Sequence, residues 1–201
     1  MAQAAGLDVP EARLLCRTSR EPGFFAVKRF DRAEQRRIHL HTICGLLEAP
    51  HTYPSMGYDQ LLAATRSLTR DEGAVAEVFR RACFNVFAHN RDDHSKNFAF
   101  LMDEGGQWRP SPAYDLTYSE GPGGQHAMLF VSESGEPGEA DLRGLAERAG
   151  LRGAAEIIDR VRGAVARFLE FAEEMPAAAR RALAKRLGAE APVRRRGRQR
   201  R

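Results

Sequence analysis

Residues 90–97 have the sequence NRDDHSKN, and this stretch decides which fold the rest of the chain predicts. The run before it, 71–89, carries apolar residues such as Val75 and Phe79 at helical spacing, which predicts a buried helix. The run after it, 98–110, contains FAFL, a pair of glycines and QWRP, which is typical of a β-hairpin with a glycine-containing turn. The sequence therefore predicts a buried helix, a polar loop and a hairpin in succession.

Weaker patterns predict further elements on both sides of this unit. Their limits are set by turn residues and helix-ending residues, mainly glycine and proline. In chain order they are a helix ending at Gly6, a hairpin over 11–30 with its turn at 19–23, a helix from 38 to 47, a helix over 58–68, a strand over 126–131, and helices over 139–187 separated by Gly150, Gly153 and Pro176.

The polar loop carries residues suited to phosphoryl transfer. Asp92 precedes Asn97 by five positions, and Asp115 follows the predicted hairpin. Phosphoryl transfer needs a carboxylate that accepts or orients the proton of the attacking hydroxyl, and oxygen ligands that hold Mg²⁺. The interval D-x-x-x-x-N is that of the protein-kinase catalytic loop, although no D-F-G follows it here. The loop therefore predicts a magnesium-dependent phosphotransfer site.

Other interpretations of the same residues stay open at this point. Asp92 and Asn97 are also ordinary loop-capping residues where a helix ends. A transition metal bound by His89, Asp92, Asp93 and His94 is a second alternative, although carboxylate-rich sites favour Mg²⁺. Asp93 also rivals Asp92 as the catalytic carboxylate, and the interval to Asn97 favours Asp92.

Two motifs together resemble those of the HipA-type serine/threonine kinase toxins: D-x-H-x-K-N-F at 92–98 and P-x-Y-D at 112–115. In addition, FAVKRFDR at 25–32 is similar to the family's interlobe hinge, and GLDVP at 6–10 to the helix-to-strand step before it. The resemblance covers about residues 1–175. It implies an α+β fold that is mostly α, namely a protein-kinase-like C-lobe with β-hairpins at the interlobe hinge and after the catalytic loop.

The resemblance also implies a role for eight residues. One would be the catalytic carboxylate, two would bind Mg²⁺, and five would lie against ATP. They are, in that order, Asp92; Asn97 and Asp115; and Lys28, Arg29, Phe30, His94 and Lys96. Backbone groups near Lys28 to Phe30 would hold the adenine, although the family often has an acidic residue where Lys28 stands.

The resemblance divides the chain into a remnant of the N-lobe with the hinge hairpin (1–37), a helical C-lobe (38–188) and a disordered basic tail (189–201). A kinase also needs a glycine-rich cover over the phosphates and a strand-borne lysine. Neither precedes the first predicted hairpin. The expected explanations are a truncated gene product, a misplaced start, or a partner chain that supplies the missing half. The uncapped Ala-rich segment after Met1 favours the first two.

The composition of the 201 residues, 43% of them hydrophobic, predicts one sizeable core. The net charge of +4 includes six arginines in 194–201, and without them it would be −2, so attraction to nucleic acid is expected only through that tail or indirectly. No run of about 20 apolar residues indicates a membrane span, and we expect a cytoplasmic protein. The three cysteines are predicted to be buried, with Cys83, after two arginines, as the candidate for a reactive thiol.

These expectations combine into two hypotheses. The first is a kinase lobe, the toxin of a toxin–antitoxin system, which transfers the ATP γ-phosphate to a serine or threonine of a protein. The family implies a target such as an aminoacyl-tRNA synthetase and a DNA-binding antitoxin as partner. The alternative is a non-catalytic, truncated remnant that binds an antitoxin or a nucleotide.

Overall fold

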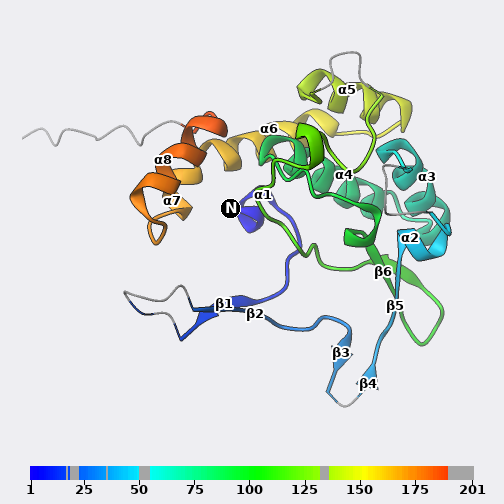
Figure 1. Cartoon of the computed structure of the whole chain (residues 1–201). Coiled ribbons are helices and arrows are strands. Elements are labelled where there is room, and N and C mark those ends of the chain that lie inside the picture. The colour runs from blue at the N-terminus through cyan, green and yellow to red at the C-terminus, as the bar shows by residue number, and fades with distance from the viewer. Residues whose placement is uncertain (17, 19–22, 35, 50–54, 132–135, 190–201) are drawn as a thin grey trace, which may run out of the picture.

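The computed structural model describes residues 1–16, 18, 23–34, 36–49, 55–131 and 136–189, and it shows a mostly helical α+β fold (Figure 1). Within that part of the chain, no helix has both the length and the apolar character needed to cross a membrane. The helices are α1 (Ala2–Ala5), α2 (Ile43–Leu46), α3 (Tyr58–Thr69), α4 (Glu72–Phe87), α5 (Glu139–Arg148), α6 (Ala154–Ala166), α7 (Phe168–Phe171) and α8 (Ala177–Arg186), with 3₁₀ turns η1 (Ser95–Asn97) and η2 (Pro122–Gly124). The strands are β1 (Ala12–Leu15), β2 (Phe24–Val27), β3 (Arg32–Ala33), β4 (Arg36–Arg37), β5 (His39–Thr42), β6 (Ala99–Met102) and β7 (Trp108–Pro110).

Helix α4 is the centre of the core, as its apolar pattern predicts. Its first turn is capped by Asp71, whose carboxylate accepts a hydrogen bond from the Gly73 amide at 2.8 Å. The apolar stripe that includes Val75 and Phe79 is fully buried. Helix α4 packs against α3 and against α6, so it is enclosed on more than one side.

The hairpin after the polar loop is confirmed, and it belongs to a larger sheet. Strand β6 pairs antiparallel with β7, placing Leu101 opposite Arg109, and its other edge pairs antiparallel with β5. Trp108 packs partly buried against the core, as predicted. The sheet therefore holds the end of the polar loop against the helical body.

The predicted helix over 38–47 is wrong in its first half. Residues His39–Thr42 form strand β5, and only Ile43–Leu46 form the short helix α2, capped by the Thr42 hydroxyl, which accepts from the Gly45 amide at 3.2 Å. The spacing of apolar residues fits a helix, but the free edge of β6 offers the backbone of 39–42 hydrogen bonds with a distant segment. This tertiary pairing outweighs the local pattern.

The predicted strand over 126–131 is also wrong. Its only ladder contact among the described residues is an isolated bridge between Gly57 and Leu129. The Leu129 amide donates to the Met56 carbonyl at 2.9 Å, and the Tyr58 amide donates back to the Leu129 carbonyl at 3.1 Å. Neighbouring amides of this segment turn to the polar loop instead of to another strand.

The first hairpin is present where the sequence predicts it. Strands β1 and β2 pair antiparallel, with Leu15 opposite Phe24, and most of the predicted turn at 19–23 lies outside the described residues. The side chains of Phe24 and Phe25 are 72% and 76% exposed. Helix α1 ends at Gly6 in the left-handed conformation (φ 87°), as expected for a glycine after a helix.

The C-terminal helices match the predicted breaks, with one addition. Helices α5 and α6 lie on either side of Gly150 and Gly153, and α8 follows Pro176, while the short helix α7 follows α6. The predicted disordered tail lies almost entirely outside the described residues, which end at 189.

The cysteines differ in exposure. Cys83 is buried and Cys44 is half-buried, as predicted, whereas Cys16 is exposed, so the prediction for Cys16 is wrong. Burial raises the pKa of the Cys83 thiol to about 12, which argues against its being a reactive thiol.

Removing the cap of α4 should destabilise the whole core. We expect Asp71→Ala to lower the free energy of unfolding by about 1 kcal/mol, because the Gly73 amide loses its acceptor. Urea denaturation followed by circular dichroism measures the change. The control is Glu147→Ala on the exposed face of α5, which should change stability by less than about 0.5 kcal/mol. Equal stability of the two variants would contradict the capping role.

Candidate active site

The polar loop begins where α4 ends in an unusual backbone conformation. His89 lies in the left-handed region (φ 51°), which stops the helix. The Asn90 amide and side chain then both bond back to Asn85, at 2.9 Å to its carbonyl and 3.0 Å to its Oδ1. The loop is thereby fixed to the last turns of the most buried helix.

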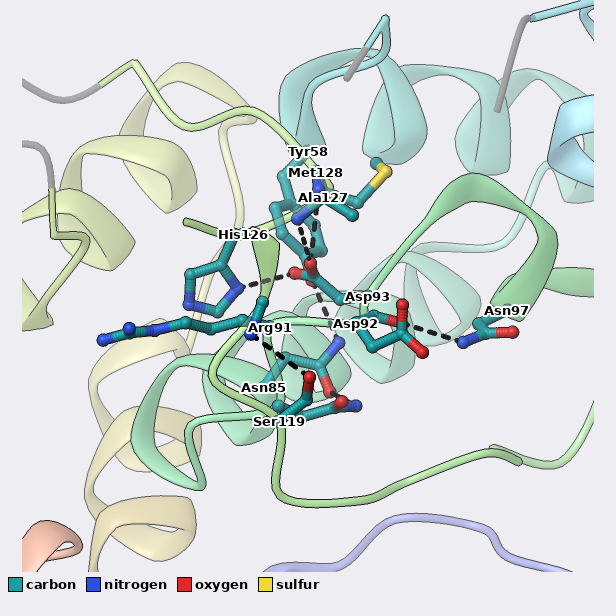
Figure 2. A network of polar contacts seen from close by, with 12 residues as sticks. Tyr58, Asn85, Arg91, Asp92, Asp93, Asn97, Ser119, His126, Ala127 and Met128 are labelled. Carbon is teal, nitrogen blue, oxygen red and sulfur yellow. Dashed lines mark hydrogen bonds and ion pairs between the residues drawn. The ribbon is translucent and has the colours of Figure 1, made fainter. Parts of the chain in front are cut away.

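The two adjacent aspartates of the loop have opposite environments. The side chain of Asp92 is 52% exposed, whereas that of Asp93 is fully buried. Figure 2 shows Asp93 directed toward Tyr58 and His126, while Asp92 lies on the side of Asn97.

Asp93 accepts four hydrogen bonds inside the core (Figure 2). Its Oδ2 accepts from the Tyr58 hydroxyl at 2.6 Å and from His126 Nδ1 at 2.8 Å. Its Oδ1 accepts from the amides of Ala127 at 2.8 Å and Met128 at 3.2 Å. A carboxylate has only acceptors, so His126 carries its proton on Nδ1 in this arrangement. The buried charge is fully hydrogen-bonded and leaves Asp93 no access to a substrate.

Tyr58 connects Asp93 to α4. The fully buried Tyr58 hydroxyl accepts from Asn85 Nδ2 at 3.0 Å while it donates to Asp93. Burial raises the pKa of Tyr58 well above its ordinary value, and the negative charge of Asp93 adds to this. Tyr58 is therefore a permanent donor, and a continuous chain of hydrogen bonds runs from Asn90 through Asn85 and Tyr58 to Asp93.

Asn97 and Asp115 are brought to the same loop. Asn97 Nδ2 donates to the Asp92 carbonyl at 3.0 Å, which leaves Asn97 Oδ1 as an available acceptor. Tyr114, which precedes Asp115, donates its hydroxyl to the carbonyl of Lys96, which precedes Asn97. Asp115 itself is exposed. Amide and carboxylate oxygens are the ligand types that Mg²⁺ prefers, so the two side chains fit that ion.

The other two predicted loop residues lie beside these groups. His94 Nε2 is 3.9 Å from Asp92 Oδ1, and its Nδ1 is buried without a hydrogen-bond partner. Lys96 is exposed. Among the described residues, no group of three or more His, Cys, Asp or Glu side chains is placed to hold a metal ion, so the transition-metal alternative has no support.

The predicted hinge residues differ in what they contact. The ring of Phe30 lies 5.5 Å from that of Tyr114, which joins the hinge segment to the residue before Asp115. The Arg29 guanidinium is bonded to Asp31 at 2.6 and 2.8 Å, and this hydrogen bonding lowers the pKa of Asp31 to about 2. Lys28 is exposed. The side chain of Arg29 is thus engaged by Asp31.

A pocket of about 710 Å³ lies between the β1–β2 hairpin and the segment that carries Asp115. Its lining includes Val9, Phe25, Val27, Tyr114 and Asp115. The volume is within the range of small-molecule sites, and the mixture of an apolar wall with one carboxylate is typical of them.

Tyr58 and His126 were not predicted to belong to the site. The side chain of Asp93 meets them only through the fold, since they lie 35 and 33 residues away from it in the chain. The sequence signal nearest to them was the pair of adjacent aspartates, Asp92 and Asp93, which rival each other as the catalytic carboxylate.

Comparison with known proteins shows the family of the chain. Residues 1–168 match the family model of the HipA-like C-terminal domain. The chain therefore belongs to this family. It is 29% identical over 128 residues to "Putative kinase Y4dM" and 33% identical over 127 residues to "Putative kinase Y4mE", both from Sinorhizobium fredii. Each match covers 58% of this chain but only 31% and 30% of those proteins.

Two solved structures share the fold. The HipA chain in the complex of the Shewanella oneidensis toxin–antitoxin system with HipB and operator DNA superposes with a TM-score of 0.73 at 21% identity. The match covers 92% of this chain and 51% of that chain. The Helicobacter pylori proinflammatory kinase CtkA superposes with a TM-score of 0.57 at 13% identity, covering 93% and 78%. The predicted kinase-like α+β fold is confirmed.

The phenol of Tyr114 offers a test of the link between the loop and Asp115. Burial raises its pKa to about 12, above the value of about 10 for a free tyrosine. Because the folded protein holds this proton more tightly, the stabilisation is complete below pH 10 and is lost as the pH rises toward 12. The alkaline absorbance titration of the native protein should contain a component near pH 12 that Tyr114→Phe removes. If the absorbance change lost in Tyr114→Phe is instead centred near pH 10, the Tyr114 phenol is not buried.

Proposed function

We propose that this chain is the ATP- and Mg²⁺-binding catalytic lobe of a HipA-like serine/threonine protein kinase, which transfers the γ-phosphate to a protein hydroxyl. The observation that carries the proposal is the exposed Asp92 carboxylate on a fixed loop. Asn97 is bonded to the Asp92 carbonyl, and Asp115 follows Tyr114, whose hydroxyl is bonded to the Lys96 carbonyl. Kinase-like relatives in fold and sequence support it.

Each group of the loop would have a defined task. Asp92 would accept or orient the proton of the attacking hydroxyl, since it is accessible where Asp93 is not. Asn97 and Asp115 would hold Mg²⁺, which neutralises charge on the phosphates when bound. Because the enzyme's contribution to this reaction is mostly positioning and charge neutralisation, few further groups are needed in this lobe.

The nucleotide would lie between the hinge segment and the loop. Backbone groups near Lys28 and Arg29 would contact the adenine, and Phe30 would offer a ring face beside Tyr114. Lys96 and His94 would brace the loop or contact phosphate oxygens. The pocket described above is lined by Val27, which precedes Lys28, and by Asp115, the proposed Mg²⁺ ligand.

The partners and setting follow from the family. We propose a protein substrate such as an aminoacyl-tRNA synthetase, and restraint by a DNA-binding antitoxin, because the HipA structure with the same fold is a complex with HipB and operator DNA. The chain would act in the cytoplasm as the toxin of such a pair. The arginine-rich tail 194–201 would be its direct contact with nucleic acid. We propose that the chain has three parts, namely the N-lobe remnant with the hinge hairpin (1–37), the helical C-lobe (38–188) and the basic tail (189–201).

A second candidate function is a non-catalytic protein that binds an antitoxin or a nucleotide. The matches cover 51% of the HipA chain and 31% of the curated relative Y4dM. The glycine-rich phosphate cover and the strand-borne lysine of a kinase have no counterpart in the sequence before β1.

A transfer assay tests the first candidate. The purified chain, with Mg²⁺ and γ-labelled ATP, should label itself or a mixture of aminoacyl-tRNA synthetases. Asp92→Asn should reduce the rate by about 100-fold or more, because the carboxylate that handles the proton is lost. The matched control is Asp103→Asn, an aspartate in the turn of the β6–β7 hairpin, which should leave the rate unchanged. Transfer that survives in Asp92→Asn would sink the assignment.

Binding measurements separate the two candidates. Calorimetry with Mg²⁺ and ATP should show binding that weakens in Asn97→Ala and in Asp115→Asn if these side chains hold the ion. Such binding without any transfer by the wild-type chain would favour the non-catalytic protein. An ATP affinity that changes neither on removal of Mg²⁺ nor in the two variants would contradict the Mg²⁺-binding roles of Asn97 and Asp115.

A further inference from the structure

The residue next to the proposed catalytic carboxylate is the most completely hydrogen-bonded carboxylate in the described part of the chain. We propose that Asp93 is a positioning residue: by tying the loop to α3 and to residues 126–128, it sets the direction of the Asp92 carboxylate. The inference rests on the proposed role of Asp92, and it adds Tyr58 and His126 to the residues on which that role depends.

The anchor joins parts of the chain that are far apart in sequence. Tyr58 is the first residue of α3, and the other three donors come from 126–128. The backbone adds further bonds: the Arg91 carbonyl accepts from the Ala127 amide at 3.2 Å, and the Arg91 amide donates to the Ser119 carbonyl at 3.3 Å. The loop is thus held by both its backbone and the Asp93 side chain.

The anchor suits a carboxylate. In this arrangement all four partners donate a hydrogen to Asp93, and an amide in its place would keep them only if its oxygen faced the Ala127 and Met128 amides and His126 changed its tautomer. Hydrogen bonds to a charged group are stronger than those between neutral groups, and a buried charge without partners is destabilising. Any movement of Asp93 away from its four donors would therefore be strongly unfavourable. The loop is therefore confined to one arrangement.

Because one peptide unit joins Asp92 to Asp93, fixing Asp93 also restricts the position of Asp92. The Asp93 side chain is fully buried in the core, and the preceding side chain, that of Asp92, is 52% exposed to solvent. On the other side, Asn97 Nδ2 holds the Asp92 carbonyl. Asp92 and the free Oδ1 of Asn97 are thereby oriented before any ligand arrives, which is what positioning requires in phosphoryl transfer.

Substitutions at His126 separate the hydrogen bond from the packing. In His126→Asn, the side-chain amide can donate from nearly the position of Nδ1, whereas His126→Leu is of similar size and has no donor. Tyr58→Phe removes the second donor to Oδ2 and keeps the ring contacts with Phe98 and Phe130. The control is Thr65→Val, which removes a buried hydroxyl bond to the Leu61 carbonyl two turns further along α3.

The expected kinetic result is a split between rate and binding. In His126→Leu and Tyr58→Phe, kcat should fall by about 100-fold while KM for ATP stays unchanged, as for a misplaced catalytic group. His126→Asn should recover most of the rate, and Thr65→Val should keep it despite its lost hydrogen bond. An unchanged kcat in His126→Leu, or an equal fall in Thr65→Val, would overturn the proposal.

A second readout does not depend on activity. Amide hydrogen exchange followed by NMR should show that Asp93→Asn and His126→Leu speed exchange at Ala127, Met128 and Asn97, while the amides of α4 keep their protection. If the wild-type chain transfers no phosphate, the proposed function fails, yet this local loss would still support the anchor. Exchange that is unchanged at these three amides, or that rises equally throughout α4, would refute it.

Discussion

A carboxylate buried in a helical core is stable only while every donor around it stays in place, and much of this structure depends on that constraint at Asp93. Its four partners require that the start of α3 and the segment 126–128 meet at one point. Tyr58 extends the same constraint to Asn85 in α4. The polar loop is therefore bonded to the core through Asp93, although the adjacent Asp92 faces solvent.

The division between the two aspartates suits a site that must be both rigid and accessible. A group that meets a substrate hydroxyl cannot also be saturated with hydrogen bonds, and a group that holds a loop cannot be free. Here two adjacent residues divide these demands, since Asp93 is fully buried and Asp92 is half-exposed. The ring of Phe30 contacts that of Tyr114, and the Tyr114 hydroxyl donates to the Lys96 carbonyl. The segment around Phe30 is therefore linked to the polar loop through Tyr114.

How far the sequence could predict this structure depended on whether the deciding interactions were local. The apolar stripe of α4 and the glycine turn between β6 and β7 are local, and both were predicted correctly. Strand β5 was not predicted, because its partner strand β6 lies about 60 residues further along the chain and the local spacing of apolar residues also fits a helix. The D-x-H-x-K-N-F motif at 92–98 located the polar loop. It did not show the role of Asp93, because the partners of Asp93 are supplied by α3 and by residues 126–128.

The backbone at Asp115 has a consequence for how this position can vary in evolution. Asp115 lies in the left-handed region (φ 56°), as does His89 at the end of α4. Aspartate, asparagine and histidine are the residue types apart from glycine that enter this region most readily, whereas β-branched residues are strained there. At Asp115 the conformation and the oxygen chemistry therefore select for the same few side chains. A change to valine or isoleucine would remove the proposed Mg²⁺ ligand and also strain the backbone.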